Sequence, residues 1–177
     1  MTGGGDRFVG RVYRAHNPRW SFSPASGAGA AKHGGRFNRP GVAALYTSSR
    51  YELAITEAHH GLPFKLQPLT IVGYEVDHAD ILDLSSTVAR RTAGIHFDEL
   101  AAPWELMAFE GRQPPGWILA DRLIEQGVGG IIVPSFAAHA PVEGYNIVFW
   151  NWRPEPPRQV CVIDDENRLP ADGSSWQ

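Results

Sequence analysis

Cysteine and lysine are scarce in this sequence, and no concentrated positive charge replaces them. The single cysteine, Cys161, excludes an internal disulfide and suits a reducing compartment such as the cytoplasm. Lysine occurs only at Lys32 and Lys65, and the formal net charge of −3 comes without a basic tail or stripe. Because nucleic-acid-binding proteins usually carry a concentrated basic surface, we expect a cytoplasmic protein with no direct contact with DNA or RNA.

Long apolar runs are also missing. No segment approaches the roughly 20 apolar residues of a membrane-spanning helix, and residues 1–6 lack the apolar centre of a signal peptide. With 177 residues, of which 43% are hydrophobic, the chain is long enough to bury one core. We expect one domain over residues 8–168, a disordered segment 1–7, a flexible tail 169–177, and no membrane contact.

Apolar periodicity predicts a mixture of strands and helices. The expected strands are 8–14, 43–47, 69–76, 80–84, 130–133, 145–152 and 159–164. The expected helices are 50–60, most of 86–112 with interruptions at Gly94 and Pro103, and 117–126, whereas 17–39 is expected to be a long loop. Strands scattered among helices without strict alternation indicate an α+β fold.

Three side chains with complementary chemistry come from different local elements in the first third of the chain. Arg36 follows Gly34 and Gly35 in the loop, Tyr46 lies in the short strand 43–47, and Glu57 lies inside the helix 50–60. Ser49 and Glu52 form a capping-box pattern at the start of that helix, and Gly61 is expected to end it.

This set suits a ligand that is anionic at one end, flat at the other, and cationic when it reacts. NAD is such a ligand. A guanidinium makes forked hydrogen bonds to phosphate, and the glycines let the backbone approach the ligand closely. The Tyr46 ring can stack on nicotinamide, and the Glu57 carboxylate can stabilise a cationic ribose carbon or activate an acceptor.

Each residue also has a purely structural interpretation. An arginine in such a loop can form a surface ion pair, and a tyrosine in a buried strand can belong to the core. Glu57 lies among Leu53, Ala54 and Ile55, so it is either solvent-facing or a costly buried charge.

Four segments of the sequence resemble the RES-domain family, which is named for an arginine, a glutamate and a serine. They are Val12-Tyr13-Arg14, Gly34-Gly35-Arg36-Phe37-Asn38-Arg39-Pro40-Gly41, Leu45-Tyr46-Thr47-Ser48 and Ala54-Ile55-Thr56-Glu57. The resemblance spans roughly residues 8–152, and Phe37 stands where the family usually has tryptophan. It implies an ADP-ribosyltransferase-like fold, a single domain with a mixed, split sheet flanked by helices.

The resemblance also implies a set of NAD-contacting residues. Arg36, Tyr46 and Glu57 take the places of the arginine/histidine–tyrosine–glutamate set of that superfamily, and Arg14 could bind the second phosphate. The other implied contacts are Gly35, Ser48, Ser135, which matches the family serine, and Asn146, which matches a family asparagine. Ser135 equally suits a turn residue that ends a strand.

Members of this family are toxins of bacterial toxin–antitoxin pairs whose antitoxin is an Xre-type helix-turn-helix protein. The resemblance therefore implies an NAD-consuming toxin that inhibits growth, with transfer of ADP-ribose to a host protein as the first hypothesis. Transfer to water or phosphate, which depletes NAD, is the second, and a non-catalytic nucleotide- or antitoxin-binding module is the third. An antitoxin segment is expected to plug the cleft, where Arg36, Arg39 and Arg14 could receive acidic groups.

A metal site is not expected. His59 and His60 are neighbours on a helix and point about 100° apart, and no cluster of cysteine or carboxylate accompanies them. The implied chemistry therefore uses NAD as a substrate and no metal.

Overall fold

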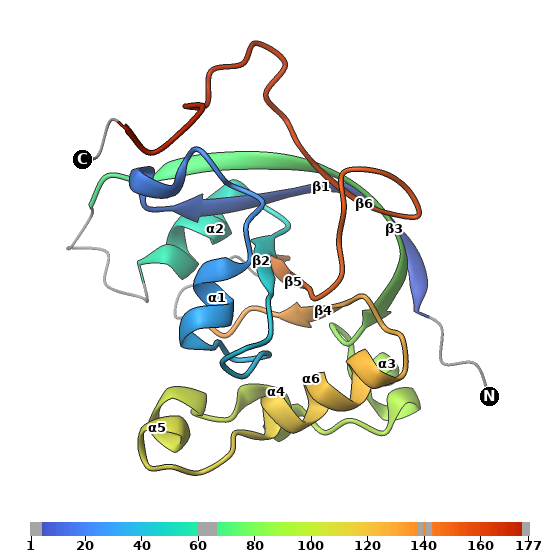
Figure 1. The fold of residues 1–177 in the computed structure, drawn as a ribbon. Helices are drawn as coiled ribbons and strands as arrows, with labels where there is room; N and C mark the ends of the chain where they lie inside the picture. Colours follow the sequence, from blue (N-terminus) through green and yellow to red (C-terminus); the bar gives the residue numbers. More distant parts are fainter. Residues whose placement is uncertain (1–4, 60–66, 138–139, 141–142, 175–177) are drawn as a thin grey trace.

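The computed structural model describes residues 5–59, 67–137, 140 and 143–174 (Figure 1). The strands are β1 Asp6–His16, β2 Leu45–Ser48, β3 Thr70–Asp83, β4 Gly130–Pro134, β5 Tyr145–Phe149 and β6 Arg158–Val162. The helices are η1 Pro18–Trp20, α1 Ala28–His33, α2 Tyr51–Ala58, α3 Thr87–Ala93, α4 Phe97–Ala101, α5 Trp104–Phe109 and α6 Pro115–Glu125. No helix in these ranges is long and apolar enough to span a bilayer.

The sheet consists of two antiparallel halves. In one half β3 lies between β1 and β6, and in the other β5 lies between β2 and β4. The halves join through a short parallel pairing of β3 with β4, from Ile81↔Gly130 to Asp83↔Ile132, and through one pair between β1 and β2, Tyr13↔Ser48. The predicted α+β fold with a mixed, split sheet is confirmed.

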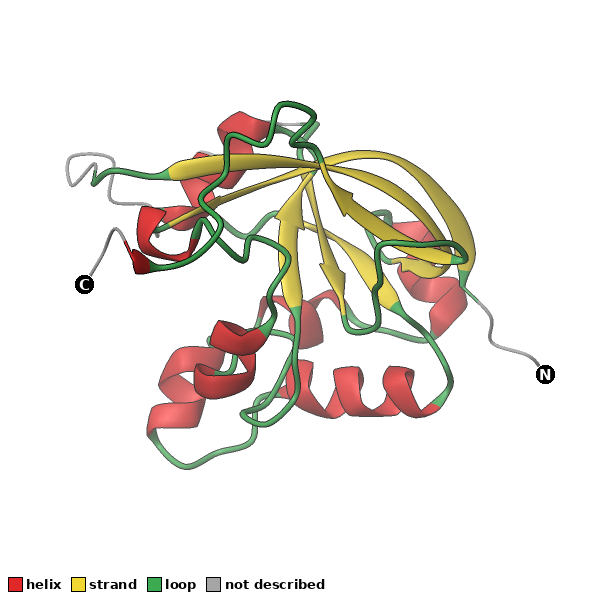
Figure 2. Cartoon of the chain, turned by 45° about the horizontal axis from the view of Figure 1, so that its top comes forward, coloured by secondary structure: helices red, strands yellow, loops and turns green. Residues whose placement is uncertain are grey.

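The half formed by β2, β5 and β4 has a core on each face. Alternate residues of a strand point to opposite faces, so Ile147 and Phe149 of β5 face the other half of the sheet, while Val148 faces the layer of α4 and α6. Figure 2 shows the strands fanning out between helices. The helix-facing side of this half-sheet also carries Tyr46.

β3 is one continuous strand, whereas the sequence predicted two strands separated at 77–79. The polar residues of that stretch are accommodated inside the sheet. Asp77 pairs with Arg7 on the exposed side at 2.7 Å. His78 is fully buried, yet both ring nitrogens have partners, Nε2 with the Asn151 carbonyl at 2.8 Å and Nδ1 with the Asp80 N–H at 3.2 Å. Because the imidazole is satisfied, the strand does not need to break.

The helices follow local signals in part. Gly94 ends α3 in the left-handed conformation (φ 66°), and Pro103 precedes α5, so both predicted interruptions are confirmed. α1 lies in the segment predicted to be a loop, where the alanine-rich stretch 28–33 forms a short helix. α2 begins at Tyr51 without the expected cap, because the Ser49 hydroxyl instead accepts the Tyr145 N–H at 3.0 Å. The expected end at Gly61 lies outside the described residues.

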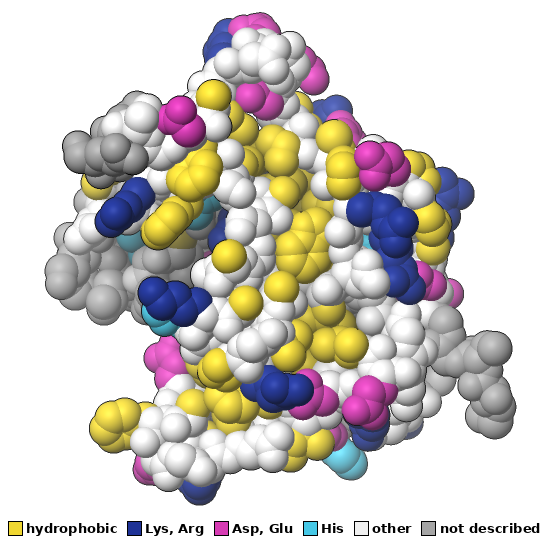
Figure 3. Space-filling view, viewed as in Figure 1, with side chains coloured by type: hydrophobic (Ala, Val, Ile, Leu, Met, Phe, Trp, Pro, Cys, Tyr) yellow, Lys and Arg dark blue, Asp and Glu magenta, His cyan; other side chains and the backbone are white. Residues whose placement is uncertain are grey.

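The ends of the domain extend slightly beyond the expected limits. Asp6 and Arg7 belong to β1 and not to a disordered segment. Leu169 packs against the core between the two half-sheets, and its N–H donates to Asp164 Oδ2 at 3.1 Å. On the face shown in Figure 3, basic and acidic side chains are interspersed and do not gather into one basic patch.

Candidate active site

A cleft of about 990 Å³ opens beside the seam between β1 and β2. Its walls come from both half-sheets, from α1 and α2, from the glycine loop at 34–37, and from α5. Apart from Ser135, all the predicted site residues line it: Arg14, Gly35, Arg36, Tyr46, Ser48, Glu57 and Asn146. Ser135 is joined to the cleft through Glu57. The fold thus brings together residues that are far apart in the sequence.

The Glu57 carboxylate is held through one of its two oxygens. Glu57 lies three and four residues after the buried Ala54 and Leu53, so it shares the inward face of α2. Its Oε1 accepts hydrogen bonds from Ser135 Oγ at 2.7 Å and Asn146 Nδ2 at 2.6 Å. None of the described residues donates to Oε2. The carboxylate is therefore fixed in orientation and keeps one oxygen for a ligand.

Ser48 of β2 extends this hydrogen-bond network by one residue beyond Asn146. It is 3% exposed, and its hydroxyl donates to Asn146 Oδ1 at 2.8 Å. Asn146 is thus bonded on both sides, by Ser48 and by Glu57. Ser48 lines the cleft, as expected of a ligand contact, but its hydroxyl is already engaged by a protein group.

Arg36 lies on the opposite wall and is held by backbone carbonyls and an aromatic ring. Its Nη1 donates to the Ala102 carbonyl at 2.7 Å and the Leu100 carbonyl at 3.3 Å, and its Cζ lies 4.7 Å from the Phe136 ring centroid. Burial lowers the pKa of Arg36, and Glu57 opposes that shift. An arginine stays protonated under these conditions. No acceptor among the described residues engages Nε or Nη2, so these donors can face an anion.

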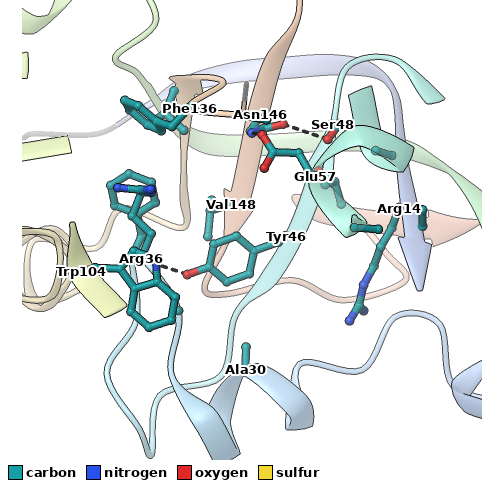
Figure 4. Close-up of a pocket in the computed structure, with 18 of the residues that line it drawn as sticks. Arg14, Ala30, Arg36, Tyr46, Ser48, Glu57, Trp104, Phe136, Asn146 and Val148 are labelled. Carbon is teal, nitrogen blue, oxygen red and sulfur yellow. Dashed lines mark hydrogen bonds between the residues drawn. The ribbon is translucent and has the colours of Figure 1, made fainter. Parts of the chain in front are cut away.

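Tyr46 presents its ring to the cleft and its hydroxyl to the protein. The hydroxyl donates to Asn38 Oδ1 at 2.8 Å and accepts the Phe37 N–H at 2.9 Å. Burial raises the pKa of Tyr46 far above its usual range. A neutral hydroxyl with both partners in place is poorly suited to proton transfer, so stacking by the ring is the chemistry that Tyr46 offers (Figure 4).

Gly35 serves close packing within the protein. A Cβ on Gly35 would lie 2.5 Å from Tyr46 Oη and 2.8 Å from Asn38 Oδ1. The sequence interpretation assigned the glycine pair to close approach of a ligand, but the group that approaches Gly35 is the tyrosine hydroxyl. The Gly35 carbonyl is also engaged, because Trp117 Nε1 donates to it at 2.7 Å.

The other two arginines expected at the cleft differ from each other. Arg14 lines the cleft, where its Nη1 donates to the carbonyls of Pro24 at 3.0 Å and Ser26 at 3.1 Å. Arg39 does not line the cleft and pairs with Asp121 of α6 at 2.9 Å. Arg39 is thus engaged by an acidic neighbour, and Arg14 and Arg36 are the arginines that line the cleft.

Two aromatic residues of the site were not predicted from the sequence. Trp104 lines the cleft at the start of α5. Phe136 follows Ser135 directly, and the Arg36 guanidinium lies over its ring. Figure 4 shows both on the Arg36 side, with Tyr46 between Arg36 and Glu57 and Arg14 on the Glu57 side. An aromatic residue directly after Ser135 was the available signal for Phe136.

No group of three or more potential metal ligands occurs within the described part of the chain. The Nδ1 atom of His59 bonds the Ile55 carbonyl at 2.7 Å, and His60 lies outside that part. We assign no residue to a metal.

Comparison with known proteins places the chain in a family. No curated protein matches the sequence. Among solved structures, a chain of the M. tuberculosis MbcT-MbcA toxin–antitoxin complex is similar, with a TM-score of 0.59 and 20% sequence identity, over 92% of this chain and 85% of that one. At this identity the likeness concerns the fold. A sequence model of the RES domain matches residues 11–172. The chain therefore belongs to the RES-domain family, as its glycine–arginine loop and its Glu57 helix suggested.

Proposed function

We propose that this chain is the toxin of a toxin–antitoxin pair and consumes NAD by breaking the bond between nicotinamide and ribose. One observation carries the proposal. A carboxylate with a free oxygen, Glu57, and a guanidinium with free donors, Arg36, face one cleft with the Tyr46 ring between them. A negative group for the ribose carbon and a positive group for the pyrophosphate are the charges that NAD requires.

The residues fit the demands of such a cleavage. The ribose carbon acquires oxocarbenium character when the neutral pyridine leaves, as in glycoside hydrolysis. Glu57 Oε2 would place negative charge beside that carbon, where a preorganised charge is most effective. The Tyr46 ring would hold the flat leaving group, and the free donors of Arg36 would bind phosphate oxygens. Arg14, which lines the cleft on the Glu57 side, is a second cation available to the anionic part of NAD.

Two versions of the proposal differ in the acceptor of the ribosyl carbon. The first is a side chain of a host protein, which yields mono-ADP-ribosylation. The second is water or inorganic phosphate, which makes the protein a hydrolase or phosphorylase that depletes NAD. The same Glu57 oxygen could orient or deprotonate any of these acceptors, so the first half of the reaction is common to both.

The experiment that separates these versions follows labelled NAD. Purified protein is incubated with NAD labelled in the adenylate part and a bacterial lysate, beside a Glu57→Gln control, with and without inorganic phosphate. A labelled protein band that the control lacks would establish a transferase. Glu57-dependent loss of NAD without a band would indicate hydrolysis or, if the product changes with phosphate, phosphorolysis. Intact NAD in every sample would contradict the enzyme proposal and favour the binding module.

The partner proposal rests on the family and on the cleft. The similar structure is a toxin–antitoxin complex by its title, and the family pattern suggests an Xre-type helix-turn-helix antitoxin. An acidic or carboxylate-terminated segment of that protein could reach Arg14 and Arg36. Leu106 of α5 lines the cleft and is 52% exposed. A partner that covers the cleft would bury Leu106, and NAD cleavage should stop when it binds.

A further inference from the structure

Ser48 lies where three strands meet, at the seam that joins the two half-sheets. It is paired with Tyr13 of β1 on one side and with Asn146 of β5 on the other. The β1–β2 pairing consists of this one residue pair. The position of Ser48 is therefore set by both halves of the sheet at once, and the residue is 3% exposed.

The Ser48 hydroxyl reaches the reactive carboxylate through one intermediate side chain. It donates to Asn146 Oδ1 at 2.8 Å, and Asn146 Nδ2 donates to Glu57 Oε1 at 2.6 Å. The two ends of an amide have opposite hydrogen-bonding character, and an ionised carboxylate only accepts. A donor at Oδ1 keeps the amide turned so that Nδ2, and not Oδ1, faces the carboxylate.

We propose that Ser48 is a positioning residue that acts through Asn146, and not a contact of the substrate. It holds Asn146 so that Glu57 is bonded at Oε1 and presents Oε2 to the cleft. The kinetic consequences of this assignment rest on the proposed function. The structural basis of the assignment is the chain of two hydrogen bonds and the burial of the hydroxyl.

The two roles predict different kinetics. Removal of a group that binds substrate and transition state equally raises KM and leaves kcat unchanged, whereas removal of a group that serves only the transition state lowers kcat. For Ser48→Ala we expect kcat for nicotinamide release to fall about tenfold, the value of one lost hydrogen bond of ordinary strength. KM for NAD should stay within about twofold.

A neighbouring serine supplies the matched control. The Ser49 hydroxyl accepts the Tyr145 N–H at 3.0 Å and takes no part in the network. Ser49→Ala removes the same atom one residue away and should leave kcat and KM unchanged. Ser48→Thr retains the hydroxyl on a residue that strands accept, and it should restore most of kcat if it folds as judged by circular dichroism.

A second readout does not depend on NAD cleavage. In a ¹⁵N-labelled protein, the side-chain amide signals of Asn146 report its two hydrogen bonds, and they should shift and exchange faster with solvent in Ser48→Ala but not in Ser49→Ala. Unchanged Asn146 signals, or a raised KM at unchanged kcat, would overturn the proposal. If the unmodified protein leaves NAD intact, the proposed function fails on that result, and the amide signals still decide the positioning role.

Discussion

The two walls of the cleft hold their charged groups by different means. Glu57 is held by side chains, Ser135 and Asn146, at the ends of two strands of one half-sheet. Arg36 is held by the backbone carbonyls of Leu100 and Ala102, at the end of α4, and by the Phe136 ring. The carboxylate therefore depends on sheet register, and the guanidinium depends on where a short helix ends.

The two walls therefore suit different roles. The Glu57 wall fixes the direction of a charged group, and the Arg36 wall attracts an anionic ligand. Hydrogen bonds from side chains on paired strands fix the direction of the carboxylate, as chemistry at one atom requires. Carbonyls and a ring face engage one side of the guanidinium and leave its other donors free, which suits binding of an anion whose exact place matters less. We expect changes at the Glu57 wall to affect kcat and changes at the Arg36 wall to affect KM.

Glu57→Gln is expected to have the largest effect on NAD cleavage. The amide oxygen can still accept from Ser135 and Asn146, so the fold should survive, but the negative charge is lost. We expect NAD cleavage to fall by about 10²–10⁴-fold, the range of a lost general base or electrostatic stabiliser. Nicotinamide release measures the rate, and an unchanged melting temperature shows that the fold is intact. A rate within twofold of the unmodified protein would contradict the role of Glu57.

Arg36→Lys tests the other wall. Lysine keeps the charge but cannot donate to two carbonyls, lie flat on Phe136 and still present a fork to phosphate. We expect KM for NAD to rise about tenfold, with a smaller change in kcat. Initial-rate kinetics over a range of NAD concentrations measure both. The assignment of Arg36 to binding is wrong if kcat alone falls.

Tyr46 lies between the two walls, and Tyr46→Phe separates the role of its ring from the role of its hydroxyl. The ring remains, but Asn38 Oδ1 and the Phe37 N–H lose their partner. Buried groups without partners cost about 1–3 kcal/mol, so the free energy of unfolding should fall by that amount. We expect kcat per folded molecule to change by less than about threefold. Denaturant titration beside the kinetics checks both values, and a large loss of kcat would assign chemistry to the hydroxyl.

The smallest effect concerns His78, which is buried in β3 next to Phe149 of the half-sheet that carries the Glu57 wall. Burial lowers the pKa of His78, while the Asn151 carbonyl and Asp80 oppose the shift. Below the unfolded value of about 6.5, the unfolded chain therefore binds more protons than the folded one. Stability should be full above that pH and decrease as the pH falls.

Melting temperatures between pH 7 and pH 5 test this prediction. The decrease should be smaller in His78→Gln, whose amide takes up no proton. His16 also has a pKa lowered by burial, so it contributes a remaining part of the decrease in that variant. Equal decreases in the two proteins would remove His78 as a cause.

Local signals were sufficient for part of this structure. Gly94 and Pro103 act on their own backbone, and the helix around Glu57 follows from its apolar stripe, so these features could be predicted from the sequence. The spacing of Arg36, Tyr46 and Glu57 likewise suggested one site, and the cleft brings them together.

Other features depend on partners far along the chain. The carbonyls that accept from Arg36 belong to residues 64 and 66 positions later in the chain. Asn146, which accepts from Ser48, is 98 positions after it. β3 stays unbroken because Asn151, 73 residues distant, satisfies His78. No local pattern reports such contacts, and for the same reason Ser48 was interpreted as a ligand contact and Ser49 as a helix cap.

The order of these partners along the chain has a consequence for synthesis. Arg36, Tyr46 and Glu57 leave the ribosome early, but the donors that orient Glu57 follow 78 and 89 residues later. A nascent chain that stops before Ser135 holds these three residues without either donor, and one that stops before β5 still lacks Asn146. The cleft therefore acquires its full lining, which extends to Val148, only after β5 has been made.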